Sequence, residues 1–165
     1  MDRAACPGRW AGPPPAAGAN FAPCRARDRG TALALLVAVL TILIADDEPH
    51  VVELVRVTLE DDRVRVFDAG DGRTALAAAE SLEPELVLLD VHLPDVSGLD
   101  VCRLLRKHPR LACTKIIMLT AAAQQDDIAR GFTAGATDYL TKPFSPVRLL
   151  SLVERLLPRL AWPPA

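Results

Sequence analysis

The chain has 165 residues, half of them hydrophobic and 24% charged, a composition typical of one globular domain and unlike that of a disordered or fibrous protein. Its formal net charge is −2, with +3 in residues 1–30 and −5 in residues 31–165, and an acidic main body argues against nonspecific nucleic-acid binding by that part. The four cysteines form no CxxC pair and have no histidine at zinc-site spacing, which argues against a structural zinc site.

Residues 1–30 contain eight Ala, five Pro and four Gly and lack a periodic apolar pattern. Such a segment buries too little apolar surface to offset the entropy lost on ordering. We therefore expect residues 1–40 to form a disordered or loosely packed extension, which would be a regulatory segment, a linker or an over-extended start of the coding sequence. Residues 31–40 either extend the first strand or form a short helix.

The apolar run Ala32–Ala45 follows three arginines and resembles the core of a signal peptide. It is shorter than the roughly 20 apolar residues that span a bilayer, and no small-residue cleavage site follows it. Its second half is also the first strand of the domain described next. We therefore expect a cytoplasmic protein without membrane association.

From residue 41 to residue 157, short apolar runs alternate with segments of helical periodicity, and a tail of residues 158–165 follows. The helical segments begin near Val51, Gly72, Gly98, Ile128 and Ser145, and the last one ends at Pro158. The expected strands are Thr41–Ala45, Val64–Phe67, Leu86–Leu89, Ile116–Leu119 and Asp138–Leu140. Five such alternations predict an α/β fold, a doubly wound five-stranded parallel sheet flanked by five helices.

Chemically active residues stand at the ends of these strands, where sheets of this kind bind their ligands. Asp46-Asp47-Glu48 follows the first strand, Asp90 the third, Thr120 the fourth and Lys142 the fifth. Clustered carboxylates raise one another's pKa unless a cation neutralises them. Mg²⁺ prefers oxygen ligands, and the Lys142 ammonium could bind a phosphoryl oxygen. The pattern therefore indicates a magnesium-dependent phosphoryl site.

Five segments together resemble the receiver domain of two-component response regulators, the (βα)5 or flavodoxin-like receiver fold. The intervals of 43 residues from Asp47 to Asp90, 30 to Thr120 and 22 to Lys142 also fit that family. The resemblance covers residues 41–157 only. The segments are Ile44-Ala45-Asp46-Asp47-Glu48-Pro49, Leu88-Leu89-Asp90-Val91-His92-Leu93-Pro94, Gly98-Leu99, Thr120-Ala121 and Thr141-Lys142-Pro143-Phe144.

The resemblance implies a role for each site residue. Asp90 would be the phosphoacceptor, forming an aspartyl phosphate, while Lys142 and Thr120 would contact the phosphoryl group. Mg²⁺ would be bound by Asp47, Asp90 and the backbone carbonyl of His92, with Asp46 acting through metal-bound water. The Lys142-Pro143 peptide bond would be cis.

The resemblance also implies a switch, in which Thr120 moves toward the phosphoryl group and Tyr139 follows it. The donor would be a sensor histidine kinase or a phosphotransfer protein, and the conformational change would signal to an unidentified protein in a phosphorelay. The chain would catalyse only its own phosphorylation and dephosphorylation, so we do not expect an enzyme in the usual sense. It would be a monomer or a phosphorylation-dependent dimer.

Three other readings are possible. A pseudo-receiver, used only as a protein-interaction module, would lack Asp90, Lys142 or the acidic pair, and all are present. An aspartate-nucleophile phosphohydrolase usually carries a second Asp two residues after the nucleophile, where this chain has His92. A nucleotide-binding flavodoxin-like protein would need a Gly-rich loop after the first strand, where Glu48-Pro49 stands instead. Because residues 158–165 are too few for a DNA-binding domain, we expect no direct DNA binding by this chain.

Overall fold

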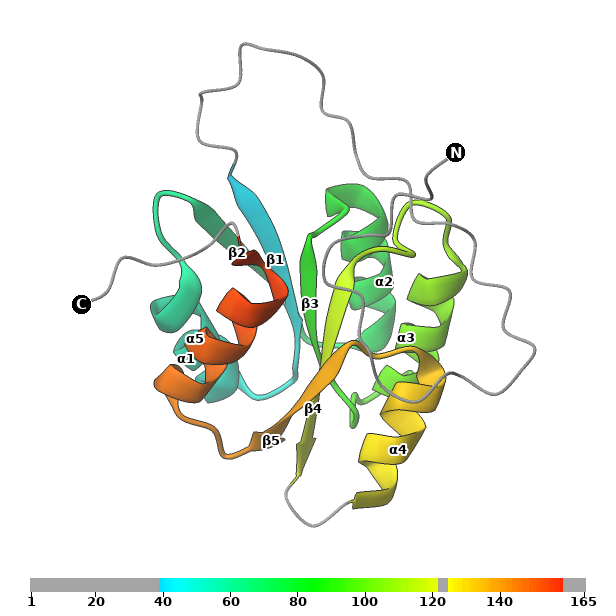
Figure 1. The fold of residues 1–165 in the computed structure, drawn as a ribbon. Helices are drawn as coiled ribbons and strands as arrows, with labels where there is room; N and C mark the ends of the chain where they lie inside the picture. The colour runs from blue at the N-terminus through cyan, green and yellow to red at the C-terminus, as the bar shows by residue number, and fades with distance from the viewer. Residues whose placement is uncertain (1–38, 122–124, 159–165) are drawn as a thin grey trace, which may run out of the picture.

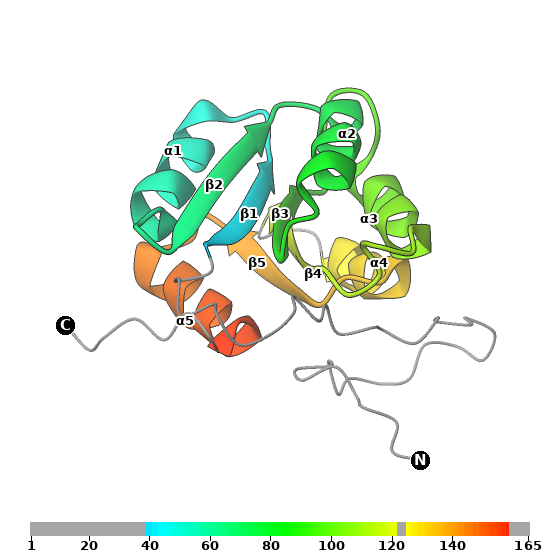
Figure 2. The ribbon, with the colours of Figure 1, turned by 90° about the horizontal axis from the view of Figure 1, so that it is seen from above.

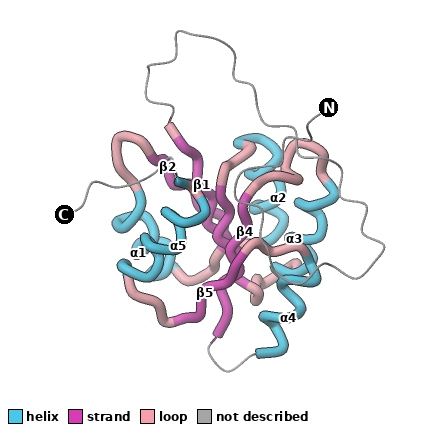
Figure 3. The backbone as a smooth tube through the Cα atoms, in the orientation of Figure 1, coloured by secondary structure: helices cyan, strands magenta, loops and turns pink. Residues whose placement is uncertain are grey.

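The structure, a computed structural model, describes residues 39–121 and 125–158, with the backbone alone for residues 125–129. Strands and helices alternate strictly along this part of the chain (Figures 1 and 3). The strands are β1 (Leu40–Ala45), β2 (Val64–Ala69), β3 (Leu86–Asp90), β4 (Lys115–Ala121) and β5 (Asp138–Lys142). The helices are α1 (Pro49–Leu59), α2 (Gly72–Leu82), α3 (Gly98–Lys107), α4 (Gln125–Ala134) and α5 (Pro146–Leu156).

The strands form one parallel sheet in the order β2-β1-β3-β4-β5. Helices α1 and α5 cover one face, and α2, α3 and α4 cover the other (Figure 2). The direction of winding reverses between β1 and β3, which is the point at which flavodoxin-like sheets bind their ligands. The predicted fold class, a doubly wound five-stranded parallel sheet with five helices, is therefore confirmed.

The central strands are buried on both faces, as a parallel sheet between two helical layers requires. Residues 42–45 of β1 and 86–89 of β3 have no exposed surface. Alternate side chains of β1 enter the two helical layers, since Ile42 and Ile44 pack toward α1 and α5 while Leu43 and Ala45 pack toward α2 and α3. Full burial of an aliphatic side chain contributes about 1.5–3 kcal/mol, so these two strands are the rigid centre of the molecule.

Strand ends are where the structure differs from the sequence prediction. Strand β2 continues to Ala69, β4 to Ala121 and β5 to Lys142. The apolar runs ended before a polar residue, which is Asp68 in β2, Thr120 in β4 and Thr141 in β5, and each strand continues beyond it. At the other end of the domain, β1 begins at Leu40, one residue earlier than expected. The expected extension and tail fall mostly in residues 1–38 and 159–165, outside the described residues.

The loop between β3 and α3 is held tightly at both ends. A Cβ atom on Gly98 would lie 1.8 Å from the backbone oxygen of Asp90, so only glycine allows α3 to begin this close to β3. The Asp95 carboxylate, in the same loop, accepts hydrogen bonds from the backbone N–H groups of Gly72 and Arg73 at 2.6 and 3.1 Å. These bonds satisfy free donors at the N-terminus of α2 and fix the loop that follows Asp90.

No helix in residues 39–121 and 125–158 is long and apolar enough to cross a membrane.

We expect Gly98→Ala to destabilise the protein severely, because the added methyl group collides with the backbone of Asp90. Overpacking against a fixed backbone predicts a loss of about 3 kcal/mol or more, measured as the free energy of unfolding in urea. Gly70→Ala is the matched control, since a Cβ there meets no atom within 4 Å. Equal stability of the two variants would contradict the close approach of α3 to β3.

Candidate functional site

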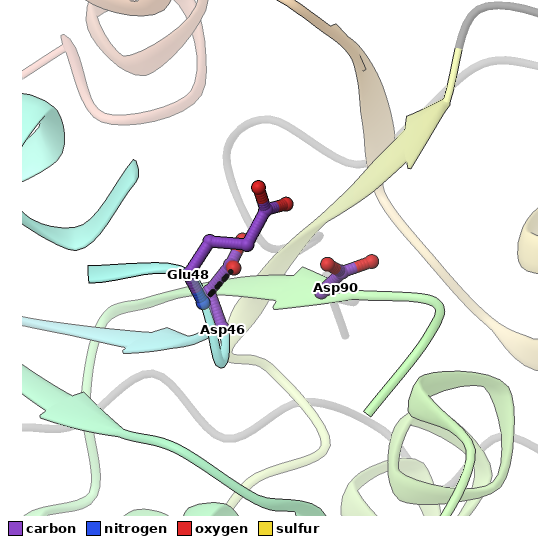
Figure 4. Close-up of side chains that lie close together, drawn as sticks. All are labelled: Asp46, Glu48 and Asp90. Atoms are coloured by element: carbon purple, nitrogen blue, oxygen red, sulfur yellow. Dashed lines mark hydrogen bonds between the residues drawn. The ribbon is translucent and has the colours of Figure 1, made fainter. Parts of the chain in front are cut away.

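Four charged side chains meet at the carboxyl edge of the sheet. Asp46 and Glu48 follow β1 and Asp90 ends β3, as Figure 4 shows, while Lys142 ends β5. The Lys142 ammonium lies 2.7 Å from Asp46 Oδ2, 2.8 Å from Glu48 Oε1 and 2.6 Å from Asp90 Oδ2. Residues separated by up to 96 positions are brought together because parallel strands present their carboxyl ends at one edge.

Asp90 is held in place through both of its carboxylate oxygens. Oδ1 accepts the backbone N–H of His92 at 3.0 Å, and Oδ2 accepts a hydrogen bond from Lys142 at 2.6 Å. The side chain is buried in the floor of the site, with Gly98 packed behind its backbone. A buried carboxylate with fixed direction and a cation against it is suited to act as a nucleophile toward an electrophilic phosphorus.

Asp46 carries buried negative charge that the protein only partly compensates. Its Oδ1 accepts the Glu48 backbone N–H at 2.9 Å. Its buried Oδ2 has the ion pair with Lys142 but no hydrogen-bond partner among the described residues. Burial raises the pKa of the Asp46 carboxyl, and the contact with Lys142 and the Glu48 N–H lower it only in part. The site is therefore short of positive charge.

The contact between Lys142 and Glu48 shifts the pKa values of the two side chains in opposite directions. Burial alone would lower the pKa of Lys142, but its contacts with the carboxylates of Asp46, Asp90 and Glu48 outweigh burial and raise it. The same contact with Lys142 lowers the pKa of Glu48. Asp46, Asp90 and Lys142 were predicted as site residues from the sequence, whereas Glu48 was noted at the strand end but given no role. Its signal was its place directly after the acidic pair, at the same strand end.

The donor set fits a hard divalent cation. Asp46, Glu48 and Asp90 each offer a carboxylate oxygen within 4.8 Å of the others, and one ammonium leaves these four groups with a net charge of −2. All the donors are oxygens, which Mg²⁺ prefers over nitrogen or sulfur ligands. A divalent cation would neutralise the remaining charge, including that of the partly compensated Asp46, so the residues fit a magnesium site.

The other predicted site residues lie around this cluster. Asp47 is exposed to solvent and is not one of the three clustered carboxylates, and the side chain of His92 is exposed as well. Thr120 is fully buried beside Thr141 of β5, and its hydroxyl has no hydrogen-bond partner among the described residues. Tyr139 lies on the face of the sheet that α2, α3 and α4 cover, and its ring packs edge-on against Phe132 of α4. The Lys142-Pro143 peptide bond is cis, as expected.

The match to a known family covers most of the domain. Residues 42–154 match the sequence model described as "Response regulator receiver domain". The chain belongs to this family. The resemblance inferred from the five strand-end segments is thereby confirmed. The described part of the chain is a receiver domain of two-component signalling, and this assignment rests on the sequence match as well as on the fold.

Two curated relatives match the receiver at over 40% identity. RpaA of Synechocystis sp., a DNA-binding dual master transcriptional regulator, is 45% identical over 118 residues, which are 72% of this chain and 49% of RpaA. The DNA-binding response regulator MtrA of Mycolicibacterium smegmatis is 41% identical over 118 residues, 72% of this chain and 50% of MtrA. The chain thus spans about half the length of the curated relatives it matches.

A solved structure is also similar. It is the receiver domain of the sensor histidine kinase PA1611 from Pseudomonas aeruginosa PAO1, described with a magnesium ion coordinated in its active-site cleft. The two are 32% identical with a TM-score of 0.65, over 72% of this chain and 98% of that one. Receivers of this fold therefore occur both in response regulators and in a sensor kinase.

The expectation about partners, which excluded DNA, is wrong. RpaA and MtrA are both DNA-binding proteins, and this chain matches about half of each. The expectation rested on the few residues after Leu157, whereas the matched relatives are about twice as long as the segment that they share with this chain. The number of residues beyond the last helix was therefore no evidence about the output.

We expect Lys142→Met to destabilise the receiver by about 3 kcal/mol, because it leaves buried carboxylates without their cation. The pKa of Lys142 is raised above its ordinary value of 10.5, so its contribution is complete at neutral pH and is lost only as the pH rises above that value. The free energy of unfolding is measured in urea at pH 7, with EDTA and then with MgCl₂.

Mg²⁺ should stabilise Lys142→Met more than the wild type, since the variant cluster carries one more uncompensated negative charge. Lys107→Met, at an exposed residue of α3, is the control and should change little. Equal stabilisation of Lys142→Met and the wild type by Mg²⁺ would contradict the net negative charge assigned to the cluster of Asp46, Glu48, Asp90 and Lys142.

Proposed function

We propose that this receiver accepts a phosphoryl group on Asp90 from a phosphohistidine of a sensor kinase or phosphotransfer protein. The observation that carries the proposal is the contact of the buried Asp90 carboxylate with Lys142, inside an acidic cluster at the carboxyl edge of the sheet. Membership of the receiver family supports the same role. A pseudo-receiver, acting only through protein contacts, would have no use for this buried arrangement of opposite charges.

The proposed transfer needs little from the protein besides position and charge. A carboxylate oxygen of Asp90 attacks phosphorus, the P–N bond of the phosphohistidine breaks, and its electron pair returns to the imidazole nitrogen, which takes up a proton. The product is a mixed anhydride on Asp90. The Lys142 ammonium stabilises the negative charge on the phosphoryl oxygens, and the hydrogen bond from the His92 N–H keeps the carboxylate in one orientation.

Mg²⁺ would supply further neutralisation of phosphoryl charge when bound. Asp46, Asp47 and Asp90 would hold it, with the His92 carbonyl. The charge deficit of the cluster supports a cation at this edge, and the choice of Asp47 follows the resemblance to receivers. Asp47 is exposed, and its carboxylate would be one of the ligands of the cation. The Asp95 bonds to α2 fix the loop that carries His92.

We propose Thr120 and Tyr139 as the residues that transmit the change. The Thr120 hydroxyl has no hydrogen-bond partner among the described residues, and a buried hydroxyl without one is free to bind a phosphoryl oxygen. Tyr139 lies next to Met118 in the sheet register. Met118 is two residues before Thr120 in β4, so both side chains and that of Tyr139 are on the same face of the sheet. Movement of Thr120 would open space toward which the Tyr139 ring could turn. The relatives RpaA and MtrA support transcriptional control as the class of output.

We expect the wild-type protein, incubated with Mg²⁺ and acetyl phosphate, to gain the mass of one phosphoryl group, and Asp90→Asn to gain none. Intact mass spectrometry measures the adduct. Asp100→Asn, at an exposed aspartate of α3, is the control and should be modified like the wild type. A wild type that takes up no phosphoryl group at saturating donor would reject the proposed function.

We expect Thr120→Ala to be phosphorylated but not to switch. The chain contains a single tyrosine, Tyr139, so fluorotyrosine labelling gives one ¹⁹F NMR signal. Phosphorylation should shift this signal in the wild type and in Thr120→Ser, which keeps the hydroxyl, but not in Thr120→Ala. The same shift in Thr120→Ala would show that Tyr139 responds without the Thr120 hydroxyl.

A further inference from the structure

The Lys142 ammonium is surrounded by carboxylates, with hydrogen bonds to Glu48 and Asp90 and an ion pair with Asp46. A lysine ammonium carries three N–H donors, and three carboxylate oxygens lie within 2.6–2.8 Å of Lys142 Nζ. The proposed function requires the same ammonium to contact the phosphoryl group on Asp90. Three oxygens this close leave little room around the ammonium, so we expect a phosphoryl oxygen to displace one of the three carboxylates when it arrives.

The three contacts differ in how easily they can be released. The side chains of Asp46 and Asp90 are 0% and 9% exposed, whereas that of Glu48 is 44% exposed. A buried carboxylate that loses its cation keeps an uncompensated negative charge, whereas an exposed carboxylate is hydrated by solvent water. Asp90 is also the residue that carries the phosphoryl group, so it stays beside the ammonium. Glu48 is the partner that can leave.

The Glu48 carboxylate has other favourable contacts within reach. Its second carboxylate oxygen lies 3.3 Å from Nε2 of the exposed His50. It stands at the N-cap of α1, where its side chain makes no capping hydrogen bond and where the helix dipole favours negative charge. Its backbone N–H is fixed by Asp46, so the side chain can turn away while the main chain of the site stays in place.

We propose, on the basis of the proposed function, that Glu48 is the exchangeable partner of Lys142. It holds the ammonium among the carboxylates before phosphorylation and releases it to the phosphoryl oxygen afterwards. Glu48 is thus a positioning residue, which acts through Lys142 and does not touch the reacting atoms. It restrains phosphorylation in two ways, by occupying one donor of Lys142 and by placing negative charge beside an arriving anion.

The test is Glu48→Gln, which keeps the shape of the side chain and removes its charge. At saturating Mg²⁺, we expect its rate of phosphorylation by acetyl phosphate to rise about two- to fivefold, the effect of losing one partly exposed ion pair. Its affinity for Mg²⁺, measured separately by isothermal titration calorimetry, should fall because the cluster has lost a charge. Opposite changes in rate and metal affinity are not expected from a merely structural residue.

Glu53→Gln is the matched control, an exposed glutamate of α1, and it should leave both quantities unchanged. Glu48→Ala repeats the test if the glutamine variant is poorly folded. An unchanged or slower rate in the Glu48 variants, with normal phosphorylation of the wild type, would overturn the exchange. Absence of phosphorylation in the wild type would instead reject the proposed function, so the two failures are distinct.

Discussion

The domain depends on an imbalance of charge at one edge of its sheet. Three carboxylates lie within hydrogen-bonding distance of the Lys142 ammonium. The four side chains come from different positions in the chain. In a parallel sheet this convergence follows from topology, because every strand ends at the same side. The surplus of negative charge makes the edge receptive to a cation, and the fixed ammonium makes it receptive to a phosphoryl group. Fold and chemistry are thus two results of the same arrangement.

Close packing behind the site makes this arrangement stable. Gly98 lets α3 begin directly against the backbone of Asp90, and Asp95 ties the intervening loop to α2. Neither residue faces the acidic cluster. Both nevertheless fix the position of Asp90, since a carboxylate at the end of a strand is only as well placed as the loop that follows it. The precision of the site comes from its supports as much as from its charged residues.

Most of the fold could be predicted from sequence, because buried parallel strands and amphipathic helices leave strong apolar patterns. The ends of β2, β4 and β5 could not, because Asp68, Thr120 and Thr141 interrupt the apolar pattern there. Asp46, Asp90 and Lys142 were found from their places after strands. Glu48 was missed, because its contact with Lys142 depends on a side-chain direction that spacing does not reveal. The partners were misjudged, because the expectation was drawn from the length of the segment after the last helix and not from any residue of the receiver.

The position of Lys142 in the sheet has a consequence for how the domain holds together. Among the described residues strand β5 is an edge strand that pairs with β4 alone, yet it supplies the cation for carboxylates that follow β1 and end β3. If β5 frays, those carboxylates lose their counter-charge at once, and their mutual repulsion acts on the centre of the sheet. The least supported strand and the best buried ones are therefore coupled electrostatically. A fragment that stopped after β4 would keep four strands of the sheet but would carry an unneutralised acidic core.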